Sequence, residues 1–395
     1  MKFSVLLPTR NRLEYLRYAV SSVLEQDYDH WEIIISDNDS EEDIKGYVVS
    51  LADARIRYYR TESFCSVTDN WNNALEKATG DYIIMLGDDD CLLRGYFSLS
   101  IELINQQQFP DLIYSSALIY AYPGVAPDAP QGYLMQCGYA AFLVKTQAPV
   151  ILDPLEVQCL VKEMMNFNVS VNFNPQHSLM SRKLIEEMQK FGKFYQSPYP
   201  DYYSTISLFL MAKRVLAVPY PMVVIGITPK SFGSYYMNNN GQHGEEYLKS
   251  SSHRENYKDL AKYIISGSEM NVYWLFSLES VRRTYTEVHS LKVNYKKFRF
   301  LQILHQCKKF ACREGVQFKD MMGYWRHLFV LEKLVYFLSF LLALFIRSSP
   351  KNHRGKAYAS AKAYSFSHPA LGVPKKFAGE YKNIMDVFQQ FKIND

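Results

Sequence analysis

Strand-like runs and helix-like segments alternate through the first 90 residues, and this alternation constrains the fold more than any other feature. The runs rich in apolar residues lie at residues 3–7, 31–36, 56–59 and 82–86. Segments with apolar side chains on one helical face lie between them, at residues 12–25, 44–51 and 68–78. Strands that alternate with helices form parallel βαβ units, and continuous apolar strands are typical of a sheet covered on both faces. We therefore predict an α/β fold with a mostly parallel sheet flanked by helices.

The pattern beyond residue 110 predicts the domain organisation. The chain has 395 residues, long enough for two domains or for one domain with a large extension. Shorter elements follow the first half-sheet, with strands expected at residues 112–115, 215–218 and 222–227 and a helix at 180–191. We predict a catalytic-type domain at 1–230, a polar and aromatic mobile loop at 231–250, and a helical C-terminal region at 251–395.

One apolar stretch of the C-terminal region has two interpretations. Residues 334–346 read LVYFLSFLLALFI, thirteen residues without a charge, and Arg347 and further basic residues follow. A bilayer span needs about 20 apolar residues, so the stretch is too short to cross a membrane. It is either a buried core helix or a helix that lies in the inner surface of a membrane, with its basic flank on anionic lipid.

Composition excludes several classes of protein. With 48% hydrophobic and 21% charged residues, the chain is globular rather than disordered. Its net charge of +4 is too small to indicate a nucleic-acid partner. The six cysteines contain no CxxC pair, which is typical of reduced thiols, and the apolar run in MKFSVLLPTRNR is shorter than a signal peptide requires. We therefore expect a cytoplasmic protein.

Three adjacent aspartates, Asp88, Asp89 and Asp90, follow a buried-type strand in the sequence IIMLGDDDCLL. Carboxylates this close repel one another, most strongly where water is scarce. Protonation of one member offsets the repulsion, and so does a bound Mg²⁺ or Mn²⁺, since these cations prefer oxygen ligands. The alternative is a solvated turn, because glycine and aspartate are common in turns.

Polar clusters also follow the first two strands, as TRNR at residues 9–12 and DNDS at 37–40. In open α/β sheets ligands bind outside the carboxyl ends of the strands, so three such clusters at one edge favour the metal site over the turn. The chain has neither a GxGxxG nor a GxxxxGK[ST] motif, which argues against a dinucleotide-binding Rossmann domain and a P-loop. A nucleotide would instead be held through its base by Asp37 and through its phosphates by a metal and basic groups.

The three motifs together, VLLPTRNR, SDNDS and GDYIIMLGDDD, resemble those of the family two glycosyltransferases, which use nucleotide-diphospho-sugars and have the GT-A fold. The resemblance covers roughly the first 110 residues and extends more loosely to about residue 230. It implies that Pro8, Thr9 and Arg10 line the nucleoside pocket. It also implies that Asp37 accepts a hydrogen bond from the uracil ring.

The same resemblance assigns roles within the acidic motif, whose usual sequence in the family is DxD. Gly87 stands where the first acid of that motif often stands. Asp88 would then face the ribose, and Asp89 would hold Mn²⁺ or Mg²⁺ with Asp90 nearby. In inverting members one later carboxylate deprotonates the acceptor hydroxyl, and Asp201 in SPYPDYYS occupies the comparable place. A second interpretation makes Asp201 the cap of a helix that begins at the next residue.

These assignments predict an inverting, metal-dependent transfer from a nucleotide-diphosphate donor, UDP-sugar favoured, to a hydroxyl of a glycan or lipid-linked acceptor. Such an enzyme would take part in polysaccharide biosynthesis, in the cytoplasm or peripherally at the cytoplasmic face of the membrane. Two alternatives stay open: a nucleotidyltransferase, and a catalytically silent scaffold of a membrane glycan-assembly complex. The absence of glycine from PTRNRLEY counts against the first, and retention of GDDD with Asp201 counts against the second.

Overall fold

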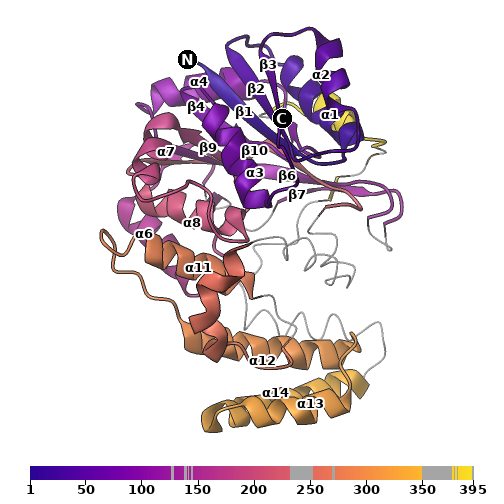
Figure 1. Ribbon diagram of the computed structural model, residues 1–395, viewed down its shortest axis with the longest axis vertical. Coiled ribbons are helices and arrows are strands. Elements are labelled where there is room, and N and C mark those ends of the chain that lie inside the picture. Colours follow the sequence, from indigo (N-terminus) through magenta and orange to yellow (C-terminus); the bar gives the residue numbers. More distant parts are fainter. Residues whose placement is uncertain are drawn as a thin grey trace. The chain divides into compact units, whose positions relative to one another are not determined.

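The computed structural model describes residues 1–125, 129–137, 140, 142–143, 146–231, 252–268, 272–348, 376–377, 379 and 381–393. The chain divides into two compact units (Figure 1). Unit 1 comprises Met1–Val161, Val171–Ser251 and Leu371–Asp395, and unit 2 comprises Lys162–Ser170 and Ser252–Ala370. The predicted domain boundaries stay a prediction, and the predicted mobile loop at 231–250 lies, apart from Ser231, outside the described residues.

Unit 1 is built on one mixed sheet. Its strands are β1 (Phe3–Thr9), β2 (Trp31–Asp37), β3 (Ile56–Arg60), β4 (Tyr82–Met85), β5 (Cys91–Leu92), β6 (Leu112–Ala121), β7 (Tyr133–Gln136), β8 (Val150–Ile151), β9 (Ser178–Ser181), β10 (Val215–Ile227) and β11 (Lys376–Phe377). The strand order is β11-β7-β6-β9-β4-β1-β2-β3, and β10 pairs with β5, β6 and β8. The four N-terminal strands pair in parallel, as predicted, and β9 runs antiparallel between β4 and β6.

Helices cover both faces of this sheet (Figure 1). The helices of unit 1 are α1 (Leu13–Leu24), α2 (Ile44–Leu51), α3 (Val67–Lys77), α4 (Tyr96–Gln106), the short η1 (Pro175–His177), α7 (Arg182–Gln189), α8 (Pro200–Met211) and α16 (Ile384–Gln390). A further helix, α6 (Pro154–Met165), begins in unit 1, and its last four residues belong to unit 2. Several begin at side-chain caps: Ser66 accepts a hydrogen bond from the backbone N–H of Asp69, and Ser181 accepts one from that of Leu184. The predicted fold class is confirmed.

Two elements differ from the sequence-based expectation. The helix expected at 180–191 begins only at Arg182, because Met180 belongs to β9 and pairs with Ile83 and Leu112. The strands expected at 215–218 and 222–227 form one strand, β10, that passes through Pro221 with a register shift against β6. A proline inside a pattern suggests a break, but here an irregularity in the pairing accommodates it.

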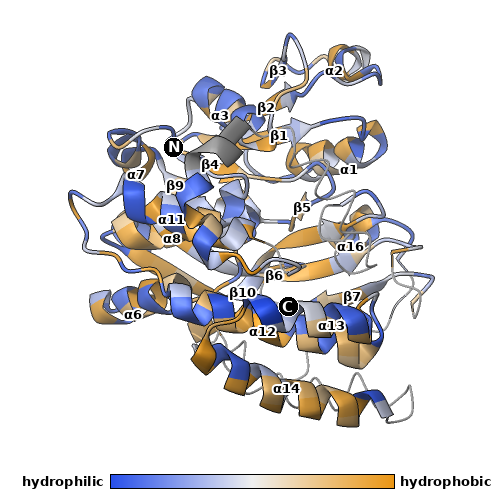
Figure 2. Ribbon diagram, turned by 60° about the horizontal axis from the view of Figure 1, so that its bottom comes forward, coloured by the Kyte–Doolittle hydropathy of each residue, from blue (hydrophilic) through white to orange (hydrophobic). Residues whose placement is uncertain are grey.

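Unit 2 is helical. Its elements are η2 (Ser252–Tyr263), α11 (Tyr273–Thr284), α12 (Tyr295–Cys312), α13 (Phe318–Tyr324), η3 (Trp325–His327) and α14 (Val330–Ser348). Its core joins Ile303, Cys307 and Phe310 of α12 to Tyr336 and Ala343 of α14. Figure 2 shows how strongly apolar α14 is along its length. Even so, among the described helices none combines the length and the hydropathy that crossing a membrane would require.

Candidate active site

A cavity of about 590 Å³ opens in unit 1 at the carboxyl ends of β1 and β4. It is lined by Pro8, Thr9, Arg10, Asn11, Arg12, Asn38, Val67, Asn70, Trp71, Met85, Gly87, Asp88, Asp89, Gln176, Pro198, Tyr199, Pro200, Asp201 and Lys230. Residues from three strand ends and from α8 thus meet around one space, because parallel strands end at the same edge of a sheet. Of the predicted site residues, only Asp37 and Asp90 are not in this lining.

Arg12 joins two of the three adjacent aspartates. Its Nη1 atom lies 2.7 Å from Oδ1 of Asp88, and its Nη2 atom lies 2.8 Å from Oδ2 of Asp89. The hydroxyl of Thr9 donates to the other oxygen of Asp88 at 2.8 Å, and that of Ser231 donates to Asp89. The cost of placing two carboxylates together is therefore offset by a forked guanidinium and two hydroxyl donors.

Burial and charge act against each other in this cluster. Burial raises the pKa of Asp88, whereas the adjacent Arg12 guanidinium opposes that rise. Burial lowers the pKa of Arg12, but the Asp88 and Asp89 carboxylates outweigh it, and the net pKa lies above its ordinary value. Arg12 is therefore cationic at every relevant pH, and one positive charge already stands between the two acids that face the cavity.

Asp90 has a different role from Asp88 and Asp89. Its Oδ1 atom accepts the backbone N–H of Gly226 at 2.8 Å, and its Oδ2 atom accepts that of Gly87 at 2.8 Å as well as the amide of Gln176. Both oxygens are thus used to tie the end of β4 to β10 and to η1. Burial raises the pKa of Asp90 well above its ordinary value.

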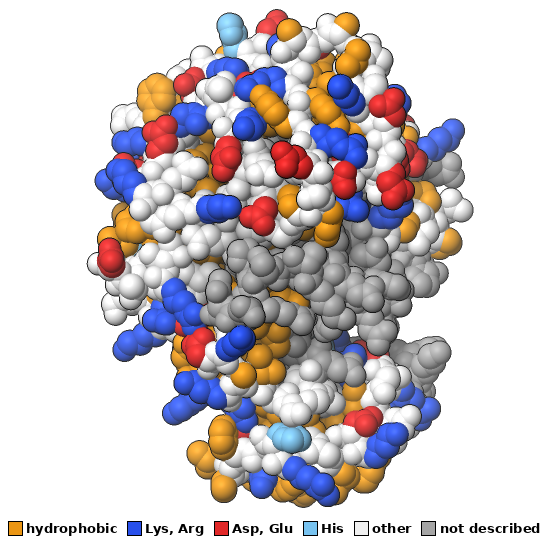
Figure 3. Space-filling model, viewed as in Figure 1, with side chains coloured by type: hydrophobic (Ala, Val, Ile, Leu, Met, Phe, Trp, Pro, Cys, Tyr) orange, Lys and Arg blue, Asp and Glu red, His pale blue; other side chains and the backbone are white. Residues whose placement is uncertain are grey.

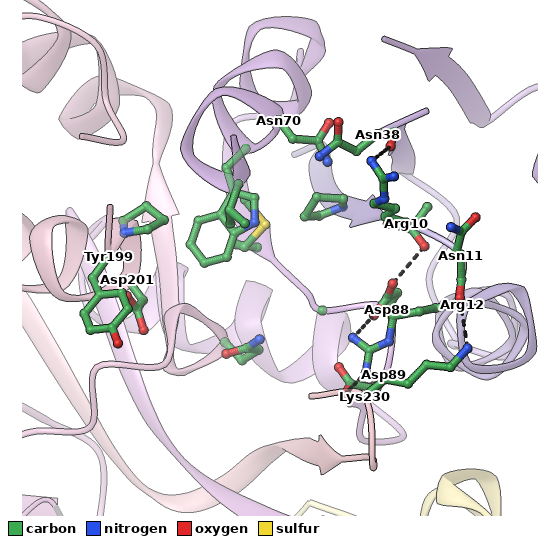
Figure 4. A pocket seen from close by; sticks show the side chains of 18 of the residues that line it. Arg10, Asn11, Arg12, Asn38, Asn70, Asp88, Asp89, Tyr199, Asp201 and Lys230 are labelled. Atoms are coloured by element: carbon green, nitrogen blue, oxygen red, sulfur yellow. Dashed lines mark hydrogen bonds and ion pairs between the residues drawn. The ribbon is translucent and has the colours of Figure 1, made fainter. Parts of the chain in front are cut away.

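The Thr9–Asn11 turn forms the part of the cavity wall next to the acids. Arg10 donates to the backbone carbonyl of Asn38 at 3.2 Å, and its guanidinium lies over the Phe64 ring. Asn11 has a φ of 52°, a left-handed conformation that asparagine tolerates better than most residues. This turn directs Arg10 toward the end of β2 while Arg12 points to the acids (Figure 4). Pro8, Thr9 and Arg10 therefore share the cavity wall, and their contact with a nucleoside stays a prediction.

Asp37 lies behind this wall and is completely buried. Its Oδ1 atom accepts the backbone N–H of Ser40 at 3.0 Å, and its Oδ2 atom accepts the hydroxyl of Tyr58 at 2.6 Å. Arg60 lies 3.7 Å from the same oxygen. The neighbouring Asn38, rather than Asp37, reaches the cavity lining, so contact between Asp37 and a uracil ring stays a prediction.

Asp201 stands across the cavity from the acidic cluster (Figure 4). It is the second residue of α8, which begins at Pro200, so it lies inside the first turn and not at a cap before Tyr202. Burial raises the pKa of the Asp201 carboxyl to about 7, although the backbone N–H groups of the helix start lower it. The side chain keeps a partial exposure, which reaches the cavity. A carboxyl of this kind can exchange a proton near neutral pH.

Helix α3 holds the segment that leads to Asp201. Asn72 makes a two-way contact with the backbone of Tyr195: its amide donates to the carbonyl at 2.9 Å, and its carbonyl accepts the N–H at 3.1 Å. Thr68 donates to the carbonyl of Ser197 at 2.7 Å. These contacts fix residues 195–197 on α3, and the chain then enters α8 with Asp201 facing the cavity.

The carboxylates suit a divalent cation only in part. No group of three His, Cys, Asp or Glu side chains that could hold a metal occurs among the described residues. Mg²⁺, however, is commonly held by one or two carboxylates together with the phosphates of a substrate. Asp89 fits that arrangement, since it lines the cavity beside Asp88. The contacts favour Asp89 over Asp90, whose oxygens already accept three donors, and the metal assignment itself stays a prediction.

Some residues of the site are not evident from the sequence. Gln176 and Lys230 line the cavity from segments that have no local motif, and only the sheet topology brings them there. Arg12 follows Arg10 in TRNR, and the spacing alone did not show which of the two arginines would meet the acids. Two cations so close to three carboxylates in the predicted fold could have suggested an ion pair.

Comparisons with known proteins find similarity mainly in the N-terminal part of the chain. Residues 4–122 match the family described as "Glycosyl transferase family 2". A Campylobacter jejuni protein named "GalNAc(5)-diNAcBac-PP-undecaprenol beta-1,3-glucosyltransferase" is 38% identical over 108 residues, which are 27% of this chain and 35% of that protein. The Escherichia coli protein "UDP-Glc:alpha-D-GlcNAc-diphosphoundecaprenol beta-1,3-glucosyltransferase WfgD" is 29% identical over 166 residues, 40% of this chain and 65% of its own.

A crystal structure of S. aureus TarS 1-349 in complex with UDP-GlcNAc is also similar, with a TM-score of 0.49 and 13% identity over 96% of this chain and 100% of that one. The matched part of the chain spans less than two thirds of both named sequence relatives. Residues 4–122, which match the family, contain β2 to β4, nearly all of β1, the TRNR turn and the three aspartates. These N-terminal residues of the chain are therefore similar to glycosyl transferase family 2.

Proposed function

We propose that this protein is an inverting glycosyltransferase that moves a sugar from a UDP-sugar to a hydroxyl of a lipid-linked or glycan acceptor. One observation carries the proposal: a single cavity has a bridged acid pair on one side and, opposite, a carboxyl whose pKa is raised to about 7. The first group suits a diphosphate leaving group, and the second suits a general base.

On the donor side, the chain offers groups for each part of the nucleotide. We assign Pro8, Thr9 and Arg10 to the nucleoside, with Asp37 behind them and Asp88 at the ribose. Three cations, Arg10, Arg12 and Lys230, line the same cavity and would attract the diphosphate. Lys230 already reaches the TRNR turn, where its Nζ donates to the carbonyl of Asn11 at 3.4 Å.

We assign Asp89 as the carboxylate that would hold Mn²⁺ or Mg²⁺ together with the donor phosphates, with Asp90 as the predicted second ligand. When bound, such an ion neutralises the charge that develops on the leaving diphosphate. In the structure Arg12 already places a positive charge at the Asp89 carboxylate. Binding of the complete donor would therefore require Arg12 to share Asp89 or to turn toward the phosphates.

On the acceptor side, Asp201 would take the proton from the attacking hydroxyl. The acceptor oxygen forms a bond to the anomeric carbon, the bond from that carbon to the phosphate oxygen breaks, and UDP leaves with the electron pair. Because the base and the acidic cluster occupy opposite sides of the cavity, attack and departure take place on opposite faces of the sugar (Figure 4). A single displacement of this kind inverts the configuration of the anomeric carbon.

The names of two relatives support the proposed acceptor class. The Campylobacter protein and WfgD both carry names that specify an undecaprenol-linked acceptor, and WfgD is named for a UDP-glucose donor. We therefore place this chain in polysaccharide biosynthesis on a lipid carrier, at the cytoplasmic face of the membrane.

The test is release of UDP from a panel of UDP-sugars with Mn²⁺ and an undecaprenyl-diphosphate-linked sugar. We expect acceptor-dependent release, loss of release in Asp89→Asn and Asp201→Asn, and an inverted anomeric configuration by NMR. UDP affinity should fall by about 1–3 kcal/mol in Asp37→Ala, the usual loss of a charged hydrogen-bond partner. Diphosphate release from a nucleoside triphosphate would identify a nucleotidyltransferase instead. No turnover with any donor would indicate a scaffold.

A further inference from the structure

The outward side of α14 is almost entirely apolar and open to solvent. We call this surface the α14 outer face. It consists of Val330, Leu331, Leu334, Phe337, Leu338, Leu341, Leu342, Leu344 and Phe345, whose exposed fractions run from 38% to 83%. Phe318 and Met322 of α13 and Phe329 before α14 are exposed as well. Monomeric soluble proteins rarely expose so large an apolar patch without a use for it.

Helix α14 has one side packed against the rest of unit 2 and a second, exposed side that is also apolar. Tyr336, Ala343 and Ile346 face the core of unit 2, so the helix already has a packed side. Its charged residues lie near the ends or on the flank: Glu332 pairs with Arg299, and Arg347 donates to the carbonyl of Phe310. A surface helix normally presents polar residues to solvent, whereas the α14 outer face has no charge from residue 334 to 346.

The excess of basic residues around the α14 outer face indicates which kind of partner would cover it. Residues 252–348 contain 16 Lys and Arg but 8 Asp and Glu, whereas residues 1–250 contain 20 Lys and Arg but 29 Asp and Glu. Residues 349–375, which follow α14, contain five Lys and Arg and no acid. Within unit 2 the exposed basic residues include Arg313, Lys319 and Arg326, close in sequence to the apolar face. Figure 3 shows basic and apolar side chains together in the part of the view where Figure 1 labels α13 and α14.

We propose that the α14 outer face docks unit 2 on a lipid bilayer with anionic headgroups. An apolar helical face rich in Leu and Phe, set among basic residues, is the pattern of a helix that lies in the membrane interface. Anionic lipid attracts a basic unit, whereas a second copy of the same basic unit repels it. Charge complementarity therefore favours the bilayer over self-association. The proposal stands on unit 2 alone, although a lipid-linked acceptor would be found at the same surface.

The first test is sedimentation of the full chain with vesicles of phosphatidylcholine containing phosphatidylglycerol, and with pure phosphatidylcholine vesicles. Binding should require the anionic lipid and weaken as salt is raised, because headgroup attraction is screened. The triple variant Leu334→Glu, Leu338→Glu and Leu341→Glu should bind at least about 100-fold more weakly, since burial of each leucine is worth roughly tenfold. Val49→Glu, which changes an equally exposed apolar residue of unit 1, is the matched control.

A second measurement gives a positive signal for insertion. Phe337→Trp places an indole on the α14 outer face, and lipids brominated on the acyl chain should quench its emission, since interfacial helices sink about 5–10 Å into the boundary. The melting temperature and donor hydrolysis of the triple variant should match those of the parent, which separates this result from failure of the proposed function. Vesicle binding that survives in the triple variant would overturn the proposal. So would a stable dimer of the parent that becomes a monomer in the variant, because the face would then bind a second copy.

Discussion

Arg12 and Asp88 form an ion pair in which Nη1 and Oδ1 are 2.7 Å apart, between side chains that are only 17% and 5% exposed. The same guanidinium reaches Asp89 at 2.8 Å. One arginine thus compensates two acids that otherwise would repel each other in a place with little water. The guanidinium of Arg12 holds this acidic pair together, and the proposed diphosphate donor would have to share or displace that charge.

Removal of Arg12 should destabilise the protein and strengthen the binding of a cation at Asp88 and Asp89. Arg12→Ala leaves Asp88 and Asp89 adjacent and uncompensated, so the free energy of unfolding should fall by about 3–5 kcal/mol. Mn²⁺ should then raise the melting temperature of the variant more than that of the parent, because binding to the folded state stabilises by mass action. Arg12→Lys, which keeps the charge but not the fork, is the control. Equal Mn²⁺ shifts in the three proteins would show that Arg12 and the metal do not compete.

Asp201→Asn should separate binding from chemistry. The variant keeps the size of the side chain, so UDP affinity measured by calorimetry should stay at the parental value. Transfer should fall by roughly 10²–10⁴-fold, the usual contribution of a general base. Glu156→Gln changes an exposed acid in the first turn of α6 and should be neutral. If Asp201→Asn lost UDP affinity along with transfer, the residue would have a structural role.

The pH profile of transfer provides an independent test of the base. The carboxyl must be ionised to accept a proton, and burial raises its pKa to about 7. The parent's kcat/KM should therefore rise with pH up to about 7 and then level off. The residual activity of Asp201→Asn should lack this rise. A profile that stays flat from pH 5 to 8 in the parent would exclude Asp201 as the base.

The same raised pKa predicts a stability cost at neutral pH. The folded state holds a proton on Asp201 up to about pH 7, whereas the ordinary value in an unfolded chain is 3.8. The folded form therefore binds more protons between these values, and its stability falls as pH rises through that window. Asp201→Asn has no carboxyl to ionise. Its free energy of unfolding at pH 8 should therefore exceed that of the parent by an amount on the order of 1 kcal/mol. At pH 3.5 the difference should vanish.

Gly226 should not tolerate a methyl group. An added Cβ at this position would lie 1.8 Å from the carbonyl oxygen of Asp89, and the same residue donates its N–H to Asp90. Gly226→Ala should cost about 3 kcal/mol or more, because backbone would have to move at the edge of the site. Gly323→Ala in α13 is the control: nothing lies within 4 Å of the added carbon, and helix propensity predicts a gain of about 0.5–1 kcal/mol. Chemical denaturation of both variants measures the two effects.

Asn72 should behave as a positioning residue. Asn72→Ala removes both hydrogen bonds to the Tyr195 backbone, which leads toward Asp201. We expect kcat to fall about tenfold or more, with UDP affinity unchanged, since a small misplacement of a catalytic group is costly. A shift in the pH midpoint of kcat would indicate that the surroundings of the Asp201 carboxyl, and so its pKa, had changed. Loss of stability alone would not cause such a shift. Asn73→Ala, at the neighbouring half-buried position, should leave both kcat and this midpoint unchanged.

The sequence by itself determined the parallel half of the sheet and the acidic edge. Short apolar runs that alternate with helical segments are typical of covered parallel strands, and the polar clusters that follow such strands meet at one edge. These are local patterns repeated along the chain, so they can be read without knowledge of the fold. The sequence pattern likewise showed that residues 334–346 form one uncharged stretch, but not which side of that helix would be packed.

Only the tertiary structure decided which groups use which partners. Asp88, Asp89 and Asp90 are adjacent and chemically identical, yet two face a cavity with Arg12 while the third holds backbone N–H groups of Gly87 and Gly226. Asp201 lies more than 100 positions away, and only the entry of α8 beside α3 brings it to the same space. Hydrogen bonds and burial depend on distances across the fold, and those distances are set by packing between segments that the linear pattern does not relate.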